Sequence, residues 1–292
     1  MGRVNYYRKF DFAYTEKLIK SALREDIGKG DVTTDLLIPE SDYSKAILKL
    51  KENGIVAGLE IFKSVFRTVD KGIKIRSLQP EGVFLKKGLN IAVLEGKSAN
   101  ILKAERVALN IIQRMSGIAS AAFALKQKLA NPDIKLVDTR KTTPNFRIFE
   151  KLAVKIGGGD NHRYGLYDMI LIKDNHIMSN GGIEKTLIKL RNKYKADKEL
   201  KVEIEVKDIN EFLKVLEIGR KLVDVVMLDN FSYGDIRKVI RLNSKVFKIE
   251  VSGGVNIGNI AEYGKIKGID MISVGALTHS VKSLDLALDF IS

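Results

Sequence analysis

Five basic side chains follow short apolar runs in this sequence: Arg140, Lys141, His162, Arg163 and Lys173. Arginine presents a planar fork that matches a carboxylate or a phosphate, and lysine acts as a compact positive charge. If the fold brings these side chains together, they form a site for a small ligand with at least two anionic groups. The alternative for each cation taken singly is a surface position paired with an acidic neighbour.

Two acidic residues are candidates for the same site. Glu205 lies inside the apolar run 202–206, and Asp229 follows the run 223–228. Glu203 is a weaker candidate, because it shares a strand face with Glu205 and could pair with a lysine of the fold. Carboxylates beside a diphosphate could bind Mg²⁺, contact ribose hydroxyl groups or stabilise a developing positive charge, and the residues leave these roles open.

Glycines mark a third group of candidate binding residues, Ser252-Gly253-Gly254 and Gly275-Ala276. In a βα barrel, the loops after the last two strands frequently bind phosphate through backbone N–H groups. Glycine lets the backbone approach the anion closely. A lone Ser-Gly-Gly is more often a plain turn, so the prediction of a phosphate site depends on its position after an apolar run.

The elements that must position these residues are short apolar runs that alternate with helical stretches from about residue 133 onwards. Strands that are buried on both faces and separated by helices are typical of a parallel α/β sheet. A closed barrel is favoured over an open doubly wound sheet, because no Gly-x-Gly-x-x-Gly motif follows the first strand. The active site of such a barrel lies at the carboxyl ends of its strands, where the candidate residues stand. The predicted strands cover residues 134–137, 153–156, 169–172, 202–206, 223–228, 247–251 and 271–274.

The first third of the chain has a different pattern. One amphipathic helix is predicted over residues 12–27 and another over 104–115. Short β-like segments separated by Gly, Pro and charged turns lie between them, which predicts a separate α/β domain. These segments cover residues 46–50, 54–57, 73–77 and 91–95.

The composition excludes several classes of function. The 292 residues include 50 Lys+Arg and 36 Asp+Glu, so the net charge is 50 − 36 = +14, but the lysines are spread along the whole chain. No helix-turn-helix or RNP-like motif accompanies them, so we expect no nucleic-acid partner. The absence of cysteine excludes disulfides and thiolate metal sites and fits a cytoplasmic location. No apolar run approaches the roughly 18 residues of a membrane span, so we expect no membrane partner.

Motifs at the ends of the predicted strands combine into a specific pattern. They are Asp138-Thr-Arg-Lys-Thr-Thr-Pro144, Gly157-Gly-Gly-x-Asn-His-Arg-x-Gly-Leu166, Leu171-Ile-Lys-Asp-Asn-His-Ile177, Leu228-Asp-Asn230 and Val251-Ser-Gly-Gly254. Glu105-Arg-Val-Ala-Leu-Asn110, Ser116-Gly-Ile-Ala119 and Asp26-Ile-Gly-x-Gly-Asp-Val-Thr-Thr34 extend the pattern over almost the whole chain. This combination resembles the quinolinate phosphoribosyltransferase family, the carboxylating nicotinate-nucleotide pyrophosphorylases of NAD biosynthesis.

Two positions depart from the family pattern. Asn145 stands where the family usually has glycine after Pro144, and Ile156 stands where cysteine often precedes the glycines. Neither departure removes a charged candidate residue, so we expect them to affect the conformation of the loops and not the activity.

The resemblance implies an α/β fold class with an N-terminal α/β sandwich domain and an incomplete seven-stranded parallel α/β barrel, as in type II phosphoribosyltransferases. The domains are then expected at residues 1–117 and 118–279, with a C-terminal helix over 280–292 that returns to the first domain. The resemblance also implies a homodimer, able to assemble further, whose active site joins one barrel to the partner's N-terminal domain. Arg106 would be donated across that interface.

The resemblance further implies a glycosyltransferase of the pentosyltransferase class. Such an enzyme moves the phosphoribosyl group of 5-phosphoribosyl 1-diphosphate to quinolinate with decarboxylation. Lys141, Glu205 and Asp229 would be catalytic, and Glu205 and Asp229 would face the ribose and Mg²⁺, directly or through water. The dicarboxylate and the phosphates would be received by Arg106, Arg140, Lys141, Thr142, His162, Arg163 and Lys173, and the ribose 5-phosphate by Ser252, Gly253, Gly254, Gly275, Ala276 and Leu277.

Two other functions compete with this interpretation. A related pyrophosphorylase associated with molybdenum-transport loci shares much of the motif set, but Lys173 keeps the anion-binding charge expected of the quinolinate enzyme. A catalytically silent polyanion- or RNA-binding protein could use the +14 charge. Such a protein would show steeply salt-dependent affinity for nucleic acid and would form no nucleotide product.

Overall fold

The chain divides into two compact units, and each is described by itself. The computed structural model describes residues 6–8, 10–194 and 200–291, so the outer ends of the predicted segments 1–117 and 280–292 lie outside it. The first unit comprises Met1–Phe123, Thr142–Gly158 and Leu277–Ser292, and the second comprises Ala124–Lys141 and Gly159–Ala276.

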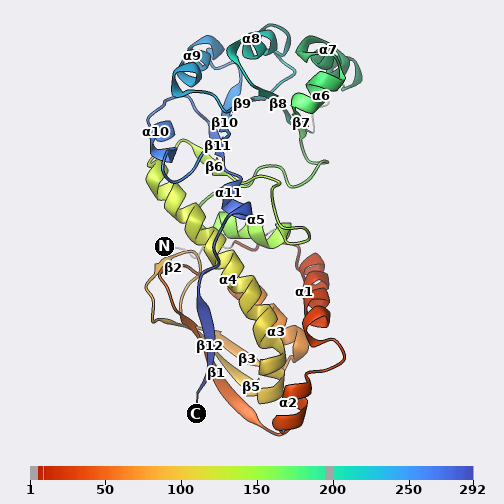
Figure 1. Ribbon diagram of the computed structural model, residues 1–292, viewed down its shortest axis with the longest axis vertical. Helices are drawn as coiled ribbons and strands as arrows, with labels where there is room; N and C mark the ends of the chain where they lie inside the picture. Colours follow the sequence, from red (N-terminus) through yellow and green to blue (C-terminus); the bar gives the residue numbers. More distant parts are fainter. Residues whose placement is uncertain (1–5, 9, 195–199, 292) are drawn as a thin grey trace. The chain divides into compact units, whose positions relative to one another are not determined.

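The first unit is built on an antiparallel sheet with strand order β12-β1-β5-β3 (Figure 1). Alternate residues of β1, Ala46, Leu48 and Leu50, are fully buried, as expected of a strand with one face on a core. Helix α1 spans Phe12–Ile27, the predicted bounds, and Asp11 caps it by accepting a hydrogen bond from the backbone of Tyr14. The other elements are α2 (Val32–Leu37), β1 (Tyr43–Leu50), β2 (Gly54–Ile55), α3 (Leu59–Val69), β3 (Lys74–Ser77), β4 (Phe84–Leu85), β5 (Asn90–Lys97), α5 (Arg147–Ile156) and β12 (Leu286–Ile291).

The end of the chain corrects one prediction. The segment expected to be a helix over 280–292 contains strand β12, which pairs antiparallel with β1 from Leu50↔Leu286 to Lys45↔Ile291. Leu284, Leu286 and Leu288 are buried. This period of two places the leucines on one face of a strand, where a helical period would scatter them.

Helix α4 spans Ser98–Leu129 and is much longer than the predicted segment 104–115. It runs without a break through residue 117, the predicted domain boundary. By length and composition it could cross a membrane, contrary to the expectation from the sequence, but 61% of its most apolar window is buried inside the protein. Ser116 and Ser120 accept hydrogen bonds from the backbone N–H groups of Ala57 and Ile55. We therefore interpret α4 as a core helix.

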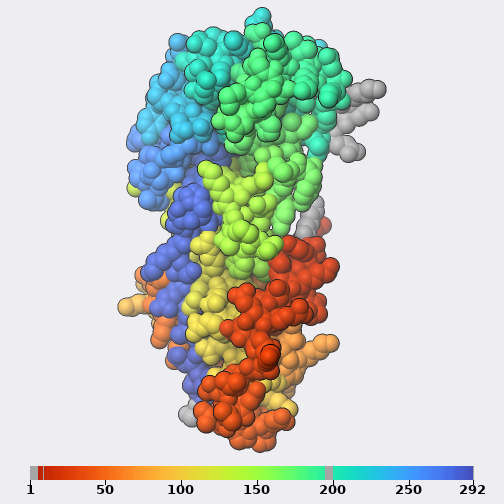
Figure 2. All heavy atoms as spheres, turned by 45° about the vertical axis from the view of Figure 1, so that its right-hand side comes forward, coloured from red at the N-terminus to blue at the C-terminus, as the bar shows by residue number. Residues whose placement is uncertain are grey.

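The second unit is built on a parallel sheet of the kind predicted, with strand order β6-β11-β10-β9-β8-β7. The helices α7, α8 and α9 pack on one another outside it, and Figure 2 shows atoms of this layer, coloured green to light blue, on the surface. The strands are nearly continuously buried, as parallel strands covered on both faces must be. The elements are β6 (Lys135–Val137), β7 (Ile170–Ile172), α6 (Asp174–Ser179), α7 (Ile183–Lys193), β8 (Val202–Val206), α8 (Ile209–Ile218), β9 (Val225–Asp229), α9 (Tyr233–Asn243), β10 (Lys248–Ser252), α10 (Ile260–Gly264) and β11 (Met271–Ser273). Helix α11 (Ala276–His279) begins at the last residue of this unit and belongs otherwise to the first.

The predicted strand 153–156 is wrong. These residues form the last turn of α5, whose apolar side chains Ile148, Phe149, Leu152 and Ile156 are buried with helical spacing. A short apolar run has the same composition in a buried strand and in a buried helix, so periodicity over four residues could not separate them. In the part of the chain that the structure describes, the place of this strand is taken by a single parallel bridge between Val137 and Asp160.

Candidate active site

The carboxyl ends of β7 and β8 bring a candidate cation and a candidate carboxylate together. Lys173 Nζ donates a hydrogen bond to Glu205 Oε2 at 2.6 Å. The Lys173 side chain is 45% exposed and that of Glu205 is 13% exposed, so both can be reached from solvent. The backbone N–H of Lys173 donates to His176 Nδ1 at 3.0 Å, which fixes the turn that presents the lysine.

The neighbouring strands add Asp229 and Ser252 to the same edge. These two residues are register partners at the ends of β9 and β10. Glu205 is the register partner of Met227, which lies two residues before Asp229, so Glu205 and Asp229 point to the same face of the sheet. The structure therefore places Lys173, Glu205, Asp229 and Ser252 along one edge of one sheet.

The glycines after Ser252 have the conformations of a tight loop. Gly253 and Gly254 have φ angles of +89° and +62°. A Cβ atom at Gly253 would lie 2.2 Å from Asn230 Oδ1, whereas one at Gly254 would meet nothing within 4 Å. Only glycine fits the first position, because it allows both the left-handed conformation and the close approach to Asn230.

The second predicted phosphate loop leads into α11. Gly275 and Ala276 are partly exposed, whereas the side chain of Leu277 is buried in the first unit. Leu277 can therefore offer a ligand only its backbone groups.

The loop that follows β6 carries further candidate cations. Arg140 is half-buried and Lys141 is exposed. Burial lowers the pKa of the Arg163 guanidinium, and the positive charge of Arg140 lowers it further. Two guanidinium groups close enough to repel each other favour the binding of an anion between them.

His162 is oriented toward the interior of the second unit. Its Nε2 lies 3.0 Å from Glu203 Oε2 and 3.3 Å from Glu250 Oε2, and both glutamates are fully buried. Burial lowers the pKa of His162, but the hydrogen bond to Glu203 and the nearby carboxylate of Glu250 outweigh it and raise the pKa to about 10. Burial and the charge of Glu250 raise the pKa of Glu203. The three side chains could also hold a metal ion by geometry, because their ligand atoms lie within 4.8 Å of one another.

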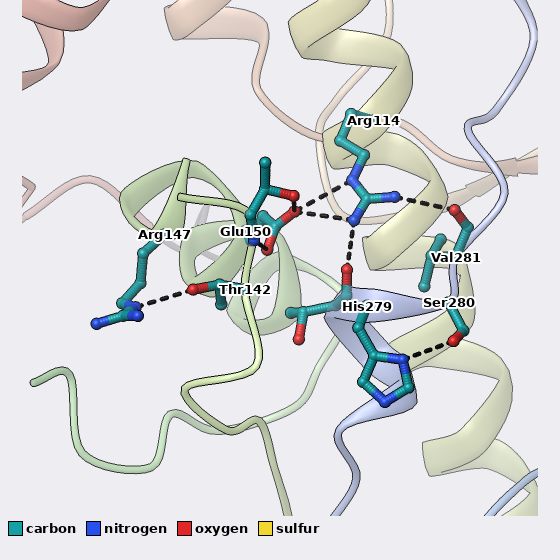
Figure 3. A network of polar contacts seen from close by, with 9 residues as sticks. Arg114, Thr142, Arg147, Glu150, His279, Ser280 and Val281 are labelled. Carbon is teal, nitrogen blue, oxygen red and sulfur yellow. Dashed lines mark hydrogen bonds and ion pairs between the residues drawn. The ribbon is translucent and has the colours of Figure 1, made fainter. Parts of the chain in front are cut away.

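The remaining candidates, Arg106 and Thr142, belong to the first unit. Arg106 is exposed on α4 and makes no hydrogen bond or ion pair with any residue among those described. Thr142 Oγ1 accepts a hydrogen bond from Arg147 Nε at 2.9 Å, across the first turn of α5 (Figure 3).

A partly buried ion pair in the first unit anchors two of the candidate segments. Arg114 of α4 donates to Glu150 Oε1 through Nε at 3.1 Å and Nη2 at 2.9 Å (Figure 3). Glu150, which is fully buried, also accepts hydrogen bonds from the backbone N–H and the hydroxyl of Thr143. Arg114 donates in addition to the backbone carbonyls of Thr278 and Val281. The pair therefore holds the segment that continues from Lys141 and the segment that continues from Leu277.

Sequence reasoning missed Glu250, Arg114 and Glu150. Glu250 had a recognisable signal, because it is a carboxylate between the apolar residues Ile249 and Val251 and shares the strand face of Ser252. Arg114 and Glu150 had none, because each lies in an amphipathic helix where an exposed charge is ordinary.

Comparison with known proteins decides the family. Residues 118–289 match the C-terminal domain of quinolinate phosphoribosyl transferase, and residues 31–116 match its N-terminal domain. The chain belongs to the quinolinate phosphoribosyltransferase family. The α/β fold class expected from the sequence is thereby confirmed.

Relatives and solved structures agree with this assignment to the quinolinate phosphoribosyltransferase family. A probable nicotinate-nucleotide pyrophosphorylase [carboxylating] of Bacillus subtilis is 40% identical over 94% of this chain and 92% of its own length. One of Methanocaldococcus jannaschii is 39% identical over 95% of this chain and 98% of its own. The structure of the nicotinate-nucleotide pyrophosphorylase from Francisella tularensis matches with a TM-score of 0.89 and 36% identity, over 99% of this chain and 100% of that chain.

Asn145, a departure from the quinolinate phosphoribosyltransferase pattern, adopts a left-handed conformation with φ of +60°. Glycine enters this region freely, and asparagine is among the residues that tolerate it best. The substitution therefore keeps the loop conformation that a glycine would allow.

The Mg²⁺ expected of a quinolinate phosphoribosyltransferase fits the carboxylates at the strand ends. Glu205 and Asp229 offer oxygen ligands from one face of adjacent strands, and both are partly open to solvent. Mg²⁺ prefers one or two carboxylates together with waters and substrate phosphates, and this donor set meets that preference.

Proposed function

We propose that the protein transfers the phosphoribosyl group of 5-phosphoribosyl 1-diphosphate to quinolinate, with release of diphosphate and CO₂. The product is nicotinate mononucleotide, and the reaction is a step of NAD biosynthesis. The observation that carries the proposal is the common edge formed by Lys173, Glu205, Asp229 and Ser252 in a chain of this family. Curated relatives named for this activity support it.

Cations of the second unit bind the dicarboxylate in this proposal. The neighbouring guanidinium groups of Arg140 and Arg163 suit two carboxylates, because each presents a planar fork of donors. Lys173 adds a compact positive charge at the end of β7. When quinolinate binds, the hydrogen bond from Lys173 to Glu205 is replaced by one to a substrate carboxylate. Lys141, which is exposed on the loop after β6, binds the diphosphate in this proposal.

The reaction then needs electrostatic stabilisation more than proton transfer. The unprotonated pyridine nitrogen attacks C1 of the ribose as the bond to diphosphate breaks, and positive charge builds up on the ribosyl centre. The carboxylates of Glu205 and Asp229 stabilise that charge, and the cations stabilise the departing diphosphate. The alkylated pyridinium next accepts the electron pair of the breaking bond to the 2-carboxylate. CO₂ leaves, and the ring carbon takes up a proton from solvent.

Mg²⁺ is the cofactor in this proposal. When bound, it neutralises charge on the diphosphate. Glu205 and Asp229 are the residues that would hold it, either directly or through water.

A homodimer completes the site in this proposal. Arg106 supports it, because this cation is exposed on α4, makes no hydrogen bond among the described residues and would be available to the site of a second subunit. The chain lacks cysteine, which supports a cytoplasmic location.

The decisive experiment incubates the protein with quinolinate, 5-phosphoribosyl 1-diphosphate and Mg²⁺ and measures nicotinate mononucleotide and CO₂. Nicotinate and nicotinamide replace quinolinate as controls, and a chelator removes the metal. We expect nicotinate mononucleotide from quinolinate but not from nicotinate or nicotinamide, and one CO₂ for each nucleotide formed. We expect no product in the presence of the chelator. Nucleotide formed from nicotinate without CO₂ would contradict the proposed substrate.

A further inference from the structure

The imidazole of His162 joins two strands of the parallel sheet that are not adjacent. Its Nε2 contacts Glu203 of β8 at 3.0 Å and Glu250 of β10 at 3.3 Å, and β9 lies between these strands. Only 9% of the His162 side chain is exposed, and both glutamates are fully buried. We call these three residues the buried clamp.

Each glutamate of the clamp lies two residues before a predicted substrate-binding residue, Glu205 for the ribose and Ser252 for its 5-phosphate. Glu203 precedes Glu205, and Glu250 precedes Ser252, so each pair shares one face of its strand. Glu250 and Glu205 are both register partners of Met227, and Ser252 is the register partner of Asp229. The clamp therefore connects the strands that present Glu205 and Ser252. Asp229 ends the strand between them.

The charges explain why this arrangement holds together. Two carboxylates buried side by side repel each other and each loses its hydration, which costs several kcal/mol per charge unless a cation compensates. His162 supplies the positive charge, and the two carboxylates raise its pKa to about 10 although burial opposes this. The other charged groups nearby are Asp138, whose Oδ1 accepts the backbone N–H of His162 at 2.9 Å, and Arg163, the next residue along the chain.

We propose that Glu250 is a positioning residue for phosphoribosyl transfer, which acts through His162 to set the spacing between Ser252 and Glu205. This inference rests on the proposed function. Nε2 of His162 contacts Glu203 and Glu250. Loss of the clamp should therefore weaken the binding of the ribose and its 5-phosphate more than the binding of quinolinate. The side chain of Glu250 is fully buried, so we assign it a role in holding His162 and not in binding substrate.

Kinetics with two variants test the positioning role. Glu250→Gln keeps the shape of the side chain and removes its charge, so the KM for 5-phosphoribosyl 1-diphosphate should rise roughly tenfold while the KM for quinolinate changes much less. Glu250→Asp keeps the charge and should recover part of the loss. The matched control is Glu262→Gln, which removes an exposed glutamate paired with Lys265 on α10 and should change neither constant. Equal rises of both KM values in Glu250→Gln would overturn the proposal.

The charge state of His162 provides a second test that needs no substrate. The chain has 3 histidines, so ¹⁵N-labelled imidazole gives a spectrum simple enough to assign with His162→Asn. We expect both ring nitrogens of His162 to stay protonated between about pH 6 and pH 9, where an ordinary histidine loses its proton. Glu250→Gln should lower the pH at which the proton is lost. A neutral His162 at about pH 7 would overturn the clamp, whereas absence of nicotinate mononucleotide in the wild-type assay would overturn the proposed function.

Discussion

Lys173 and Glu205 neutralise each other across the ends of β7 and β8, with Nζ 2.6 Å from Oε2. The cation expected to receive quinolinate is thus held by the carboxylate expected to face the ribose. A partly exposed ion pair of this kind contributes only about 0.2–1 kcal/mol, so a substrate can displace it. When quinolinate binds, a substrate carboxylate replaces Glu205 as the partner of Lys173, and Glu205 is released toward the ribose.

Replacement of Glu205 separates binding from catalysis. In Glu205→Gln, Lys173 no longer has a carboxylate partner, so quinolinate should bind about two- to fivefold more tightly in the absence of the second substrate. The turnover number should fall at least about tenfold, because the ribosyl centre loses a stabilising charge. Titration calorimetry and steady-state kinetics measure the two effects. Weaker binding of quinolinate by this variant would contradict the exchange of partners, and Glu262→Gln is the neutral control.

The left-handed Asn145 makes a prediction about stability. Asn145→Ala should reduce the free energy of unfolding by about 1 kcal/mol, because alanine keeps a Cβ, which disfavours φ of +60°, and lacks the polar side chain by which asparagine tolerates this conformation. Asn145→Gly should be neutral or slightly stabilising at the same position. Urea denaturation of the two variants and the wild type measures the difference. An alanine variant as stable as the wild type would show that the loop adopts another conformation.

The sequence predicts most elements of the parallel sheet but misplaces two segments. The bounds of β8, 202–206, are those of the apolar run, because a strand covered on both faces requires continuous apolar residues. Residues 153–156 are too few to separate a buried strand from the end of a buried helix. The family resemblance predicts a helix at the end of the chain, whereas the alternating leucines favour the strand β12 that the structure shows.

Some residues of the candidate site can be predicted from the sequence, and others cannot. Residues at strand ends, such as Lys173 and Glu205, can be found from the sequence, because parallel strands bring their carboxyl ends to one edge. The partners of His162 could not be found, because Glu203 and Glu250 lie 41 and 88 residues away in the chain and meet the histidine only through the order of the strands. Arg114 and Glu150, which are 36 residues apart, show the same limit.

The ion pair of Arg114 and Glu150 makes a prediction about coupling. Arg114→Met should cost about 3–5 kcal/mol of stability, because it leaves the buried carboxylate of Glu150 without its cation. Arg114→Met combined with Glu150→Leu should recover a large part of the loss, since no buried charge remains. Denaturant unfolding of the single and double variants gives the coupling energy. Additive losses would show that the two side chains do not act as a pair.

The loop after β10 offers a comparison between adjacent glycines. Gly253→Ala places a Cβ against Asn230, whereas Gly254→Ala places one in open space. Both positions have a positive φ, so the backbone strain is similar and the difference isolates the close approach. The KM for 5-phosphoribosyl 1-diphosphate should rise roughly tenfold or more in Gly253→Ala and much less in Gly254→Ala. Equal effects in the two variants would argue against a phosphate-binding role that depends on this contact.

The exposed Arg106 leads to a test of the shared site. Arg106→Ala and Lys141→Ala should each abolish most of the activity, because each removes a cation from every site of a homodimer. When the two inactive proteins are unfolded together and refolded, mixed dimers contain one intact site each, so about a quarter of the wild-type activity should return. Mass spectrometry of the intact complexes verifies that mixed dimers form. Verified mixed dimers without activity would show that both residues serve the same site from one chain. Refolded mixtures of each variant with itself provide the matched control and should stay inactive.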